Sequence, residues 1–420
     1  MSGDLFQGYC SLTGDGLRSY LAANDETRRR LGGQPVDWTL REVSDGNLNL
    51  VHLVEGKSGR LCVKQSLPHV RVDENWRLPL DRGANESAYL QAVLPHVSGL
   101  APELYDFDPQ LYLIVMEALV PHRVLRQELI DGHRVPQVAS AVATYVARAS
   151  FFTSDLFLPL ERKYDLLASF TGNHALKRIS SELIFQDPYY DNPRNRWTGP
   201  YLDDLVAEIR GDQRIKLAVA RLGHRFLTET QALVHGDLHT GSVMVTDEDS
   251  RVIDPEFAAF GPIGLDLGAF AGNLLLAYFA QPGLGADRQD YGVWILDQLS
   301  VFWNRFREEF LSLWRDQGRG EAYPPVLFAD EASRQVLEDE RLRFVEGLFA
   351  DLLAFAAVKI IRRITGFAHV ADFESIADPA VRSVCEANAL SLAADILRHP
   401  ERYGSVDALL AAAREGVCHD

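Results

Sequence analysis

The segment His235-Gly236-Asp237-Leu238-His239-Thr240-Gly241-Ser242 is followed at a short interval by Asp254-Pro255-Glu256. Leu233-Val234 precedes the first motif, and the apolar runs 243–245 and 252–253 lie between the two motifs. Short apolar runs separated by polar turns are typical of a strand, a loop and a further strand. The sequence therefore predicts that the carboxylates of Asp237, Asp254 and Glu256 lie on loops of one small β unit.

Three carboxylates in such an arrangement fit phosphoryl transfer from a nucleotide. That chemistry needs one carboxylate to orient the attacking hydroxyl and accept its proton, and others to hold the Mg²⁺ that bridges the phosphates. We assign Asp237 the first role, and Asp254 and Glu256 the second. The competing interpretation is a solvated hairpin, because Gly, Asp, His and Thr are common turn residues. Two motifs in this order, each at the end of an apolar run, favour the phosphoryl-transfer site.

Upstream segments supply candidates for a nucleotide site. The turn Asp45-Gly46-Asn47 precedes the strand-like run 50–54, and such a hairpin can lay backbone amides over phosphates, although most such turns only reverse the chain. Lys64 stands among apolar neighbours in 60–65 and can neutralise phosphates if a carboxylate holds it in place. Glu86, at the start of an apolar helical segment predicted over about 85–94, is the partner that we predict. The alternative is that both side chains are exposed and never meet.

The next apolar run marks a change in the pattern of the chain. Residues 111–119 predict a buried strand that ends in Glu117, where a hinge between two lobes would present backbone groups of Glu117 and Leu119 to adenine. Beyond Leu119 the periodicity is that of long helices, as in 136–152, 215–229 and 332–364, interrupted by strands only around the two motifs. We therefore expect an α+β fold with a small antiparallel-sheet lobe in residues 1–118 and a larger, mainly helical lobe in residues 119–420. The segment 186–201, rich in Pro, Asn, Asp and Tyr, predicts a surface loop that borders the substrate site.

The order of these motifs resembles that of the protein-kinase-like small-molecule kinases, which include aminoglycoside phosphotransferases and choline kinases. Three stretches narrow the resemblance to the methylthioribose kinase family: 63–71, the two motifs 235–242 and 254–257, and 361–364 with 368–370. The resemblance extends from about residue 45 to about residue 376. Ser242 stands where the wider group carries a magnesium-binding Asn, and this Ser together with Asp-x-Glu is the pattern expected of the narrower family.

The resemblance implies a bilobal protein-kinase-like fold, a homodimer, and ATP and Mg²⁺ as cofactors. The expected reaction moves the γ-phosphoryl group of ATP to the anomeric hydroxyl of 5-methylthioribose, in methionine salvage. It implies that Asp237 is the catalytic base beside the sugar, that Asp254 and Glu256 bind Mg²⁺, and that Arg362 and Arg363 contact substrate oxygens or phosphate. A tryptophan-bearing loop, here Trp76 within 73–80, also belongs to the family and departs from its usual sequence.

Alternatives remain for several of these residues. Arg362 and Arg363 could be the solvated basic end of a helix. Asp266 could cap the following helix or brace the catalytic loop, and His235 and His239 are expected to brace that loop rather than to transfer protons. The acceptor could be another small alcohol, such as an aminoglycoside or an amino alcohol, although a cationic substrate would need acidic residues in place of the twin arginines. A nucleotide-binding pseudokinase is the remaining possibility.

Composition sets broader limits. A chain of 420 residues with 47% apolar content can bury large cores, and its length favours two lobes. The formal net charge of −17 argues against a nucleic-acid partner, which needs a basic face. The four cysteines at positions 10, 62, 385 and 418 have no metal-ligand spacing, which suits a reducing compartment. Neither a long apolar run nor a signal-like start is present, so we expect a cytoplasmic protein without a membrane segment.

Overall fold

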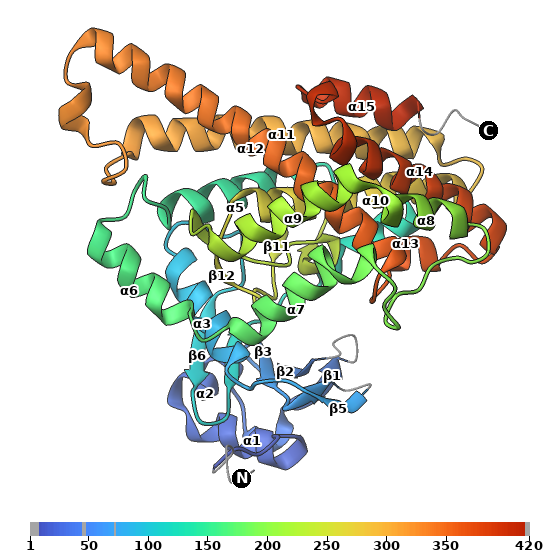
Figure 1. The fold of residues 1–420 in the computed structure, drawn as a ribbon. Helices are drawn as coiled ribbons and strands as arrows, with labels where there is room; N and C mark the ends of the chain where they lie inside the picture. Colours follow the sequence, from blue (N-terminus) through green and yellow to red (C-terminus); the bar gives the residue numbers. More distant parts are fainter. Residues whose placement is uncertain (1–7, 44–47, 71–72, 416–420) are drawn as a thin grey trace, which may run out of the picture.

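The computed structural model describes residues 8–43, 48–70 and 73–415. It confirms the predicted α+β fold: an antiparallel sheet lies in the N-terminal part of the chain, and helices make up most of the rest (Figure 1). The last strand of that sheet ends at Glu117, next to the predicted boundary. The division into lobes after residue 118 stays a prediction, which this strand end supports.

The N-terminal sheet has five strands in the order β1-β2-β3-β7-β6, and each neighbouring pair is antiparallel. Its strands are β1 (Thr39–Val43), β2 (Asn49–Glu55), β3 (Arg60–Ser66), β6 (Leu104–Asp108) and β7 (Leu113–Glu117). The helices α1 (Gly14–Ala23) and α2 (Asp25–Leu31) share a small apolar core with Leu61 and Val63 of β3. Because side chains alternate along a strand, Lys64 points to the other face of the sheet.

A helix and a hairpin complete the N-terminal part. Helix α3 (Arg82–Val93) brings Glu86 to Lys64, and the predicted start at residue 85 lies within its first turn. Strands β4 (His69–Val70) and β5 (Asp73–Arg77) pair as a separate two-stranded hairpin. Trp76 lies in β5, so the family loop of 73–80 begins as a strand here.

The two sequence motifs lie on loops that follow short strands, as predicted, but these strands form two small sheets rather than one β unit. β9 (Ala232–Val234) pairs antiparallel with β12 (Ala259–Gly261), and β10 (Val243–Val245) pairs with β11 (Ser250–Val252) and with β8 (Arg123–Val124). The first motif runs from the end of β9 through the 3-10 turn Thr240–Ser242 into β10. The second motif follows β11.

The remaining helices form the larger part of the molecule. Their bounds are α4 (Leu125–Asp131), α5 (Val138–Phe152), α6 (Leu160–Phe170), α7 (His174–Phe185), α8 (Asp203–Gly211), α9 (Gln213–Thr228), α10 (Gly264–Leu284), α11 (Gln289–Gln317), α12 (Glu331–Thr365), α13 (Ala371–Glu374), α14 (Pro379–Arg398) and α15 (Val406–Glu415). The helical segments predicted over 136–152, 215–229 and 332–364 correspond to α5, α9 and α12 within two residues at each end. Figure 1 shows α11 and the start of α12 projecting from the body as a long hairpin at the upper left.

Helix α12 reaches the motif loops because it packs closely on α10, which is buried almost from end to end. Gly264, Gly268 and Gly272 recur every four residues on the face of α10 that meets α12. A Cβ atom at Gly268 would lie 2.5 Å from the Cβ of Phe355 and 2.6 Å from the backbone nitrogen of Ala356. Glycine at these positions therefore permits the approach of the two helix backbones, which positions the C-terminal end of α12 beside the motif loops.

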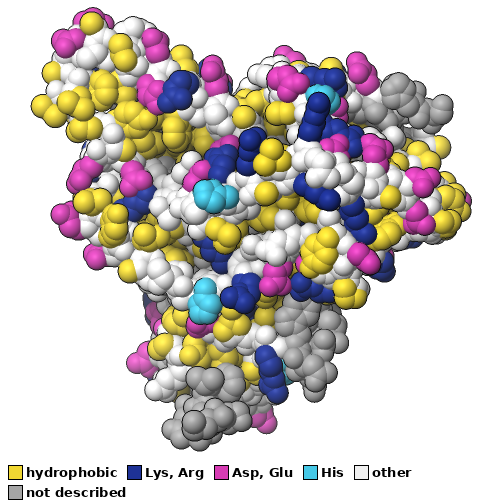
Figure 2. Space-filling view, viewed as in Figure 1, with side chains coloured by type: hydrophobic (Ala, Val, Ile, Leu, Met, Phe, Trp, Pro, Cys, Tyr) yellow, Lys and Arg dark blue, Asp and Glu magenta, His cyan; other side chains and the backbone are white. Residues whose placement is uncertain are grey.

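The surface carries mixed side chains. Figure 2 shows acidic, basic and hydrophobic groups interspersed over the face in view, with hydrophobic side chains gathered on the projecting hairpin. Among the described residues, none of the helices combines the length and apolar character that crossing a bilayer requires.

Candidate active site

The loops that carry the two motifs lie side by side. The ring of His235 donates from Nε2 to the carbonyl oxygen of Ile253 at 2.9 Å, and the backbone N–H of Ile253 donates to the carbonyl of Ser242 at 2.9 Å. Asp266 accepts from the backbone N–H groups of His235 at 2.6 Å and Gly236 at 2.9 Å. Asp266 thus braces the loop of the first motif, and His235 has the bracing role expected of it.

Two backbone positions allow the loops to meet. Gly236 has φ +86°, and a Cβ atom there would overlap the carbonyl oxygen of Phe257 in the second motif. Only glycine avoids both the strain of a positive φ and the overlap of a Cβ atom with Phe257. Asp254 has φ +68°, in the left-handed region that costs a non-glycine residue roughly 1–3 kcal/mol and that is concentrated at functional sites. This strained backbone presents the Asp254 carboxylate toward Lys64.

Lys64 makes the ion pair that the sequence predicts. Its Nζ lies 2.6 Å from Oε2 of Glu86, and it also contacts Oδ1 of Asp254. Burial alone would lower the pKa of Lys64, but the charges of Asp254 and Glu86 outweigh it and raise the pKa. The lysine is therefore a fixed cation at neutral pH, and the alternative in which Lys64 and Glu86 never meet is wrong.

Glu256 lies deep beside the same lysine. Its Oε2 accepts from Nδ2 of Asn49 at 3.1 Å and lies 3.3 Å from Nε of Arg82, whose side chain is fully buried. Arg82 also donates to the carbonyl oxygens of residues 48, 67 and 79. Asn173, which immediately precedes α7, donates from Nδ2 to the backbone carbonyl of Glu256 at 3.0 Å.

The donor set of Asp254 and Glu256 fits a divalent cation. Burial, together with the negative charge of Asp254, raises the pKa of Glu256. Two carboxylates that repel each other and offer only oxygen atoms are the ligands that Mg²⁺ prefers. Glu256 already contacts Arg82 and Asn49, so its carboxylate would bind an ion in addition to these two partners.

Asp237 is surrounded by cations. Its Oδ1 accepts from Nζ of Lys359 at 3.0 Å, and its Oδ2 lies 3.8 Å from Nη2 of Arg363 and 3.5 Å from Nε2 of His239. Burial alone would raise the pKa of the Asp237 carboxyl, but Lys359 and the other neighbouring charges hold it well below its usual range. Burial lowers the pKa of His239, so this ring is neutral at neutral pH and does not compete with Asp237 for the role of charged base.

The twin arginines are buried, at 8% and 7% exposure for Arg362 and Arg363. Nη1 of Arg363 donates to the carbonyl oxygen of Ala368 at 3.1 Å, whereas Nε and Nη1 of Arg362 and Nε of Arg363 are buried without a hydrogen-bond partner. The alternative of a solvated helix end is therefore wrong. Buried guanidinium donors without partners are costly, and an anionic ligand would satisfy them.

Sequence reasoning missed four residues of this arrangement. Lys359, Arg82 and Asn173 contact the motif carboxylates or their backbone, as described above. Arg126 of α4 lies 3.3 Å from Asp372, and its donors reach Thr240 of the catalytic loop at 3.2 Å and Asn273 of α10 at 3.0 Å. A signal was available only for Lys359, which stands in an apolar run one helical turn before Arg363 and hence on the same helix face.

Glu117 and Leu119, which are predicted to contact the nucleotide, are not brought into these contacts. The carboxylate of Glu117 lies 3.2 Å from Arg251, and its backbone N–H donates to Glu103 at 2.9 Å, while Leu119 is buried. Their role toward adenine stays a prediction. Asp45, Gly46 and Asn47 lie outside the described residues, and Trp76 is placed only by its backbone in β5.

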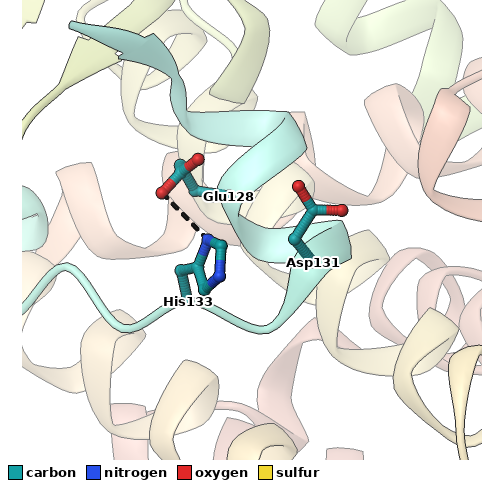
Figure 3. Close-up of side chains that lie close together, drawn as sticks. All are labelled: Glu128, Asp131 and His133. Carbon is teal, nitrogen blue, oxygen red and sulfur yellow. Dashed lines mark hydrogen bonds and ion pairs between the residues drawn. The ribbon is translucent and has the colours of Figure 1, made fainter. Parts of the chain in front are cut away.

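A second group of metal-ligand types lies elsewhere, at the end of α4 (Figure 3). Glu128, Asp131 and His133 have ligand atoms within 4.8 Å of one another. Glu128 is buried and already lies 2.9 Å from Arg123 and 3.2 Å from His133. These contacts and the hydrogen bond from Gln127 to Asp131 give all three residues protein partners.

Comparison with known proteins identifies the family of this chain. Residues 39–318 match the model described as the phosphotransferase enzyme family, and the chain belongs to this family. The methylthioribose kinase of Escherichia coli O45:K1 (strain S88 / ExPEC) is 40% identical over 99% of this chain and 100% of its own length. Methylthioribose kinases 2 and 1 of Oryza sativa subsp. japonica are 39% and 40% identical over 96% and 95% of this chain, and 96% and 94% of theirs. Within the wider family, the chain belongs to the methylthioribose kinases.

Proposed function

We propose that this protein transfers the γ-phosphoryl group of ATP to the anomeric hydroxyl of 5-methylthioribose, giving the 1-phosphate. The observation that carries the proposal is the match to a methylthioribose kinase over 99% of the chain. The site supports it, because the base candidate and the two oxygen-donor carboxylates lie on adjoining loops, and Lys64 pairs with both Glu86 and Asp254.

Each group has a distinct part in the proposed reaction. Asp237 orients the sugar hydroxyl and takes its proton as the new O–P bond forms and the bond between the γ-phosphorus and the ADP oxygen breaks. Lys64, fixed by Glu86, steadies the nucleotide phosphates. Asp254 and Glu256 would hold Mg²⁺, which would supply positive charge to offset the negative phosphate oxygens.

Further residues are proposed for substrate and nucleotide. The unpartnered donors of Arg362 and Arg363 fit the oxygens of the transferred phosphoryl group or of the sugar. We also propose that Trp76 borders the sugar, that the turn Asp45-Gly46-Asn47 covers the phosphates, and that the backbone at residues 117–119 contacts adenine.

The cationic surroundings of Asp237 disfavour the other acceptors. Lys359, Arg362 and Arg363 place three positive charges beside the catalytic carboxylate. An aminoglycoside or amino alcohol would bring further positive charge to this position and be repelled. A pseudokinase is disfavoured because the base, the lysine and the metal carboxylates are all present.

An acceptor screen tests the proposed function. The purified protein, with ATP and Mg²⁺, is offered methylthioribose, choline and an aminoglycoside, and ADP release is measured with ³¹P NMR of the product. We expect ADP release and a sugar 1-phosphate signal with methylthioribose alone, and loss of both in Asp237→Asn while ATP still binds. Phosphorylation of choline or the aminoglycoside instead, or full turnover by Asp237→Asn, would contradict the proposal.

The proposal extends to the assembly and the location of the protein. We propose a homodimer in the cytoplasm. Val326, Leu327 and Val336, between the end of α11 and the first turns of α12, are exposed, and a second copy would cover them. Cys10, Cys62 and Cys385 are free thiols among the described residues, which fits a reducing compartment that supplies ATP. Light scattering on the purified protein measures the assembly, and a monomeric mass would contradict the dimer.

A further inference from the structure

A lysine outside both sequence motifs makes the shortest contact with the proposed base. Lys359 lies on α12, is 2% exposed, and places Nζ 3.0 Å from Oδ1 of Asp237. Its sequence neighbourhood is an apolar stretch, so that a charged residue here is buried at a cost that needs a compensating partner. Asp237 is that partner.

The contact is built into the helix packing. Lys359 and Arg363 are four residues apart on α12, and they reach different oxygens of the same carboxylate, Oδ1 and Oδ2. The α10–α12 contact that depends on Gly268 fixes this helix beside the catalytic loop. The carboxylate is thus clamped between two cations of one rigid element, while its side chain keeps 22% exposure through which an acceptor hydroxyl can approach.

We propose that Lys359 is a positioning residue for the phosphoryl transfer: it orients the Asp237 carboxylate and keeps it ionised for the acceptor hydroxyl. The inference deepens the proposed function and rests on Asp237 being its base. A carboxylate offers about four lone-pair sites, so an oxygen that accepts from Lys359 can still accept from a substrate hydroxyl. The lysine acts through Asp237 and need not touch the sugar.

The other charges near Asp237 do not replace this role. Arg362 and Arg363 face it from the same helix, and His239 faces it from its own loop. Arg363 stands farther away at 3.8 Å, Arg362 forms no ion pair with the carboxylate, and His239 is neutral because burial lowers its pKa. Lys359 is itself faced by Asp266 of α10, and Arg126 of α4 faces His239.

The test is the pH dependence of kcat for Lys359→Met and Lys359→Arg, measured with whichever acceptor the wild-type protein phosphorylates. Removing a cation next to a carboxylate raises its pKa by about 1–3 units, so the acidic limb of the Lys359→Met profile should move toward neutral pH by about that amount. We expect kcat to fall and KM for ATP to stay unchanged. Lys359→Arg should restore the wild-type limb and part of kcat.

The matched control is Lys163→Met. Lys163 is also buried, at 4% exposure, and pairs with Asp155 away from the motif carboxylates. Its loss should lower the thermal midpoint without moving the pH limb. An unshifted acidic limb in folded Lys359→Met, or Lys359→Arg behaving like Lys359→Met, would overturn the inference about Lys359 and leave the proposed function standing. A wild-type protein inactive on methylthioribose would instead overturn the proposed function.

Discussion

Nε of Arg82 lies 3.3 Å from Oε2 of Glu256, and the arginine side chain is fully buried. The pair joins the start of α3 to the second motif. Glu256 therefore both forms a stabilising ion pair with the N-terminal part of the chain and is a proposed metal ligand. Removing one partner of a buried ion pair leaves an uncompensated charge, whereas an exposed pair contributes little. Stability and metal binding should therefore be linked through Glu256.

Arg82→Met tests this link. We expect the free energy of unfolding in EDTA to fall by about 3–5 kcal/mol, because Glu256 loses its buried counter-charge. Added Mg²⁺ should recover part of the loss by neutralising the same carboxylate. Urea denaturation with and without Mg²⁺ measures both. The control is Arg60→Met, whose partner Glu55 is exposed, and a loss equal to that of Arg82→Met would contradict the interpretation.

Glu256→Gln examines the metal role directly. The variant removes a negative charge but keeps a similar shape, so the Mg²⁺ concentration for half-maximal turnover should rise by about tenfold or more if one charge-assisted contact of 1.5–3 kcal/mol is lost. Titration of turnover with Mg²⁺ at saturating ATP provides the measurement. An unchanged Mg²⁺ requirement would remove Glu256 from the metal site.

Glu86→Gln should weaken the use of ATP. Lys64 would keep its contact with Asp254 but lose the charge that fixes it from α3. Since a hydrogen bond to a charged group contributes about 1.5–3 kcal/mol, we expect kcat/KM for ATP to fall by about 10- to 100-fold. Steady-state kinetics with varied ATP measures it. Glu128→Gln serves as the control, because Glu128 is an equally buried acid whose partners are Arg123 and His133, and it should leave the ATP constants unchanged.

Gly268→Val tests the packing that places α12. The added side chain would meet Phe355 and Ala356, and overpacking of this kind costs about 1–3 kcal/mol. Activity should fall further than stability, since Lys359 and the twin arginines lie on the displaced helix. Gly347→Ala on an exposed face of α12 is the matched control, and it should stabilise the helix by about 0.5–1 kcal/mol. Wild-type activity in Gly268→Val would contradict this account of the site.

The local part of the site was predictable from the sequence, and the long-range part was not. Asp237, Asp254 and Glu256 stand in short motifs whose apolar flanks show the strands, and Lys64 with Glu86 follows from their order along the chain. Lys359 reaches Asp237 across 122 residues, and Arg82 reaches the second motif from the start of a different helix. Such contacts depend on helix packing, for which one sequence offers only indirect signals such as the glycine spacing on α10.

The burial of Arg362 and Arg363 was also beyond the sequence. Basic residues in the last turn of a helix are usually solvated and favourable to its dipole, so their pattern fits two opposite environments. The apolar stretch before them indicated a buried helix but not how far the burial extends. Contacts of α10, α13 and the loop after α12 decide that outcome, and they come from segments with no pairing signal in the sequence.

Arg362 offers a prediction in which stability and activity move in opposite directions. Its Nε and Nη1 are buried without hydrogen-bond partners, and an unsatisfied buried group costs about 1–3 kcal/mol. Arg362→Met keeps much of the side-chain volume and removes both the charge and the unsatisfied donors. In the ligand-free protein the free energy of unfolding should therefore rise by about 1 kcal/mol or more. If the guanidinium contacts the substrate or its phosphate, kcat/KM for methylthioribose should fall by at least about tenfold.

Urea denaturation and steady-state kinetics on one preparation measure the two changes. Arg225→Met is the control, because Arg225 is fully partnered by Asp351 and Glu229 and its loss should lower stability. A destabilised Arg362→Met with unchanged kinetics would mean that the arginine supports the fold rather than the reaction.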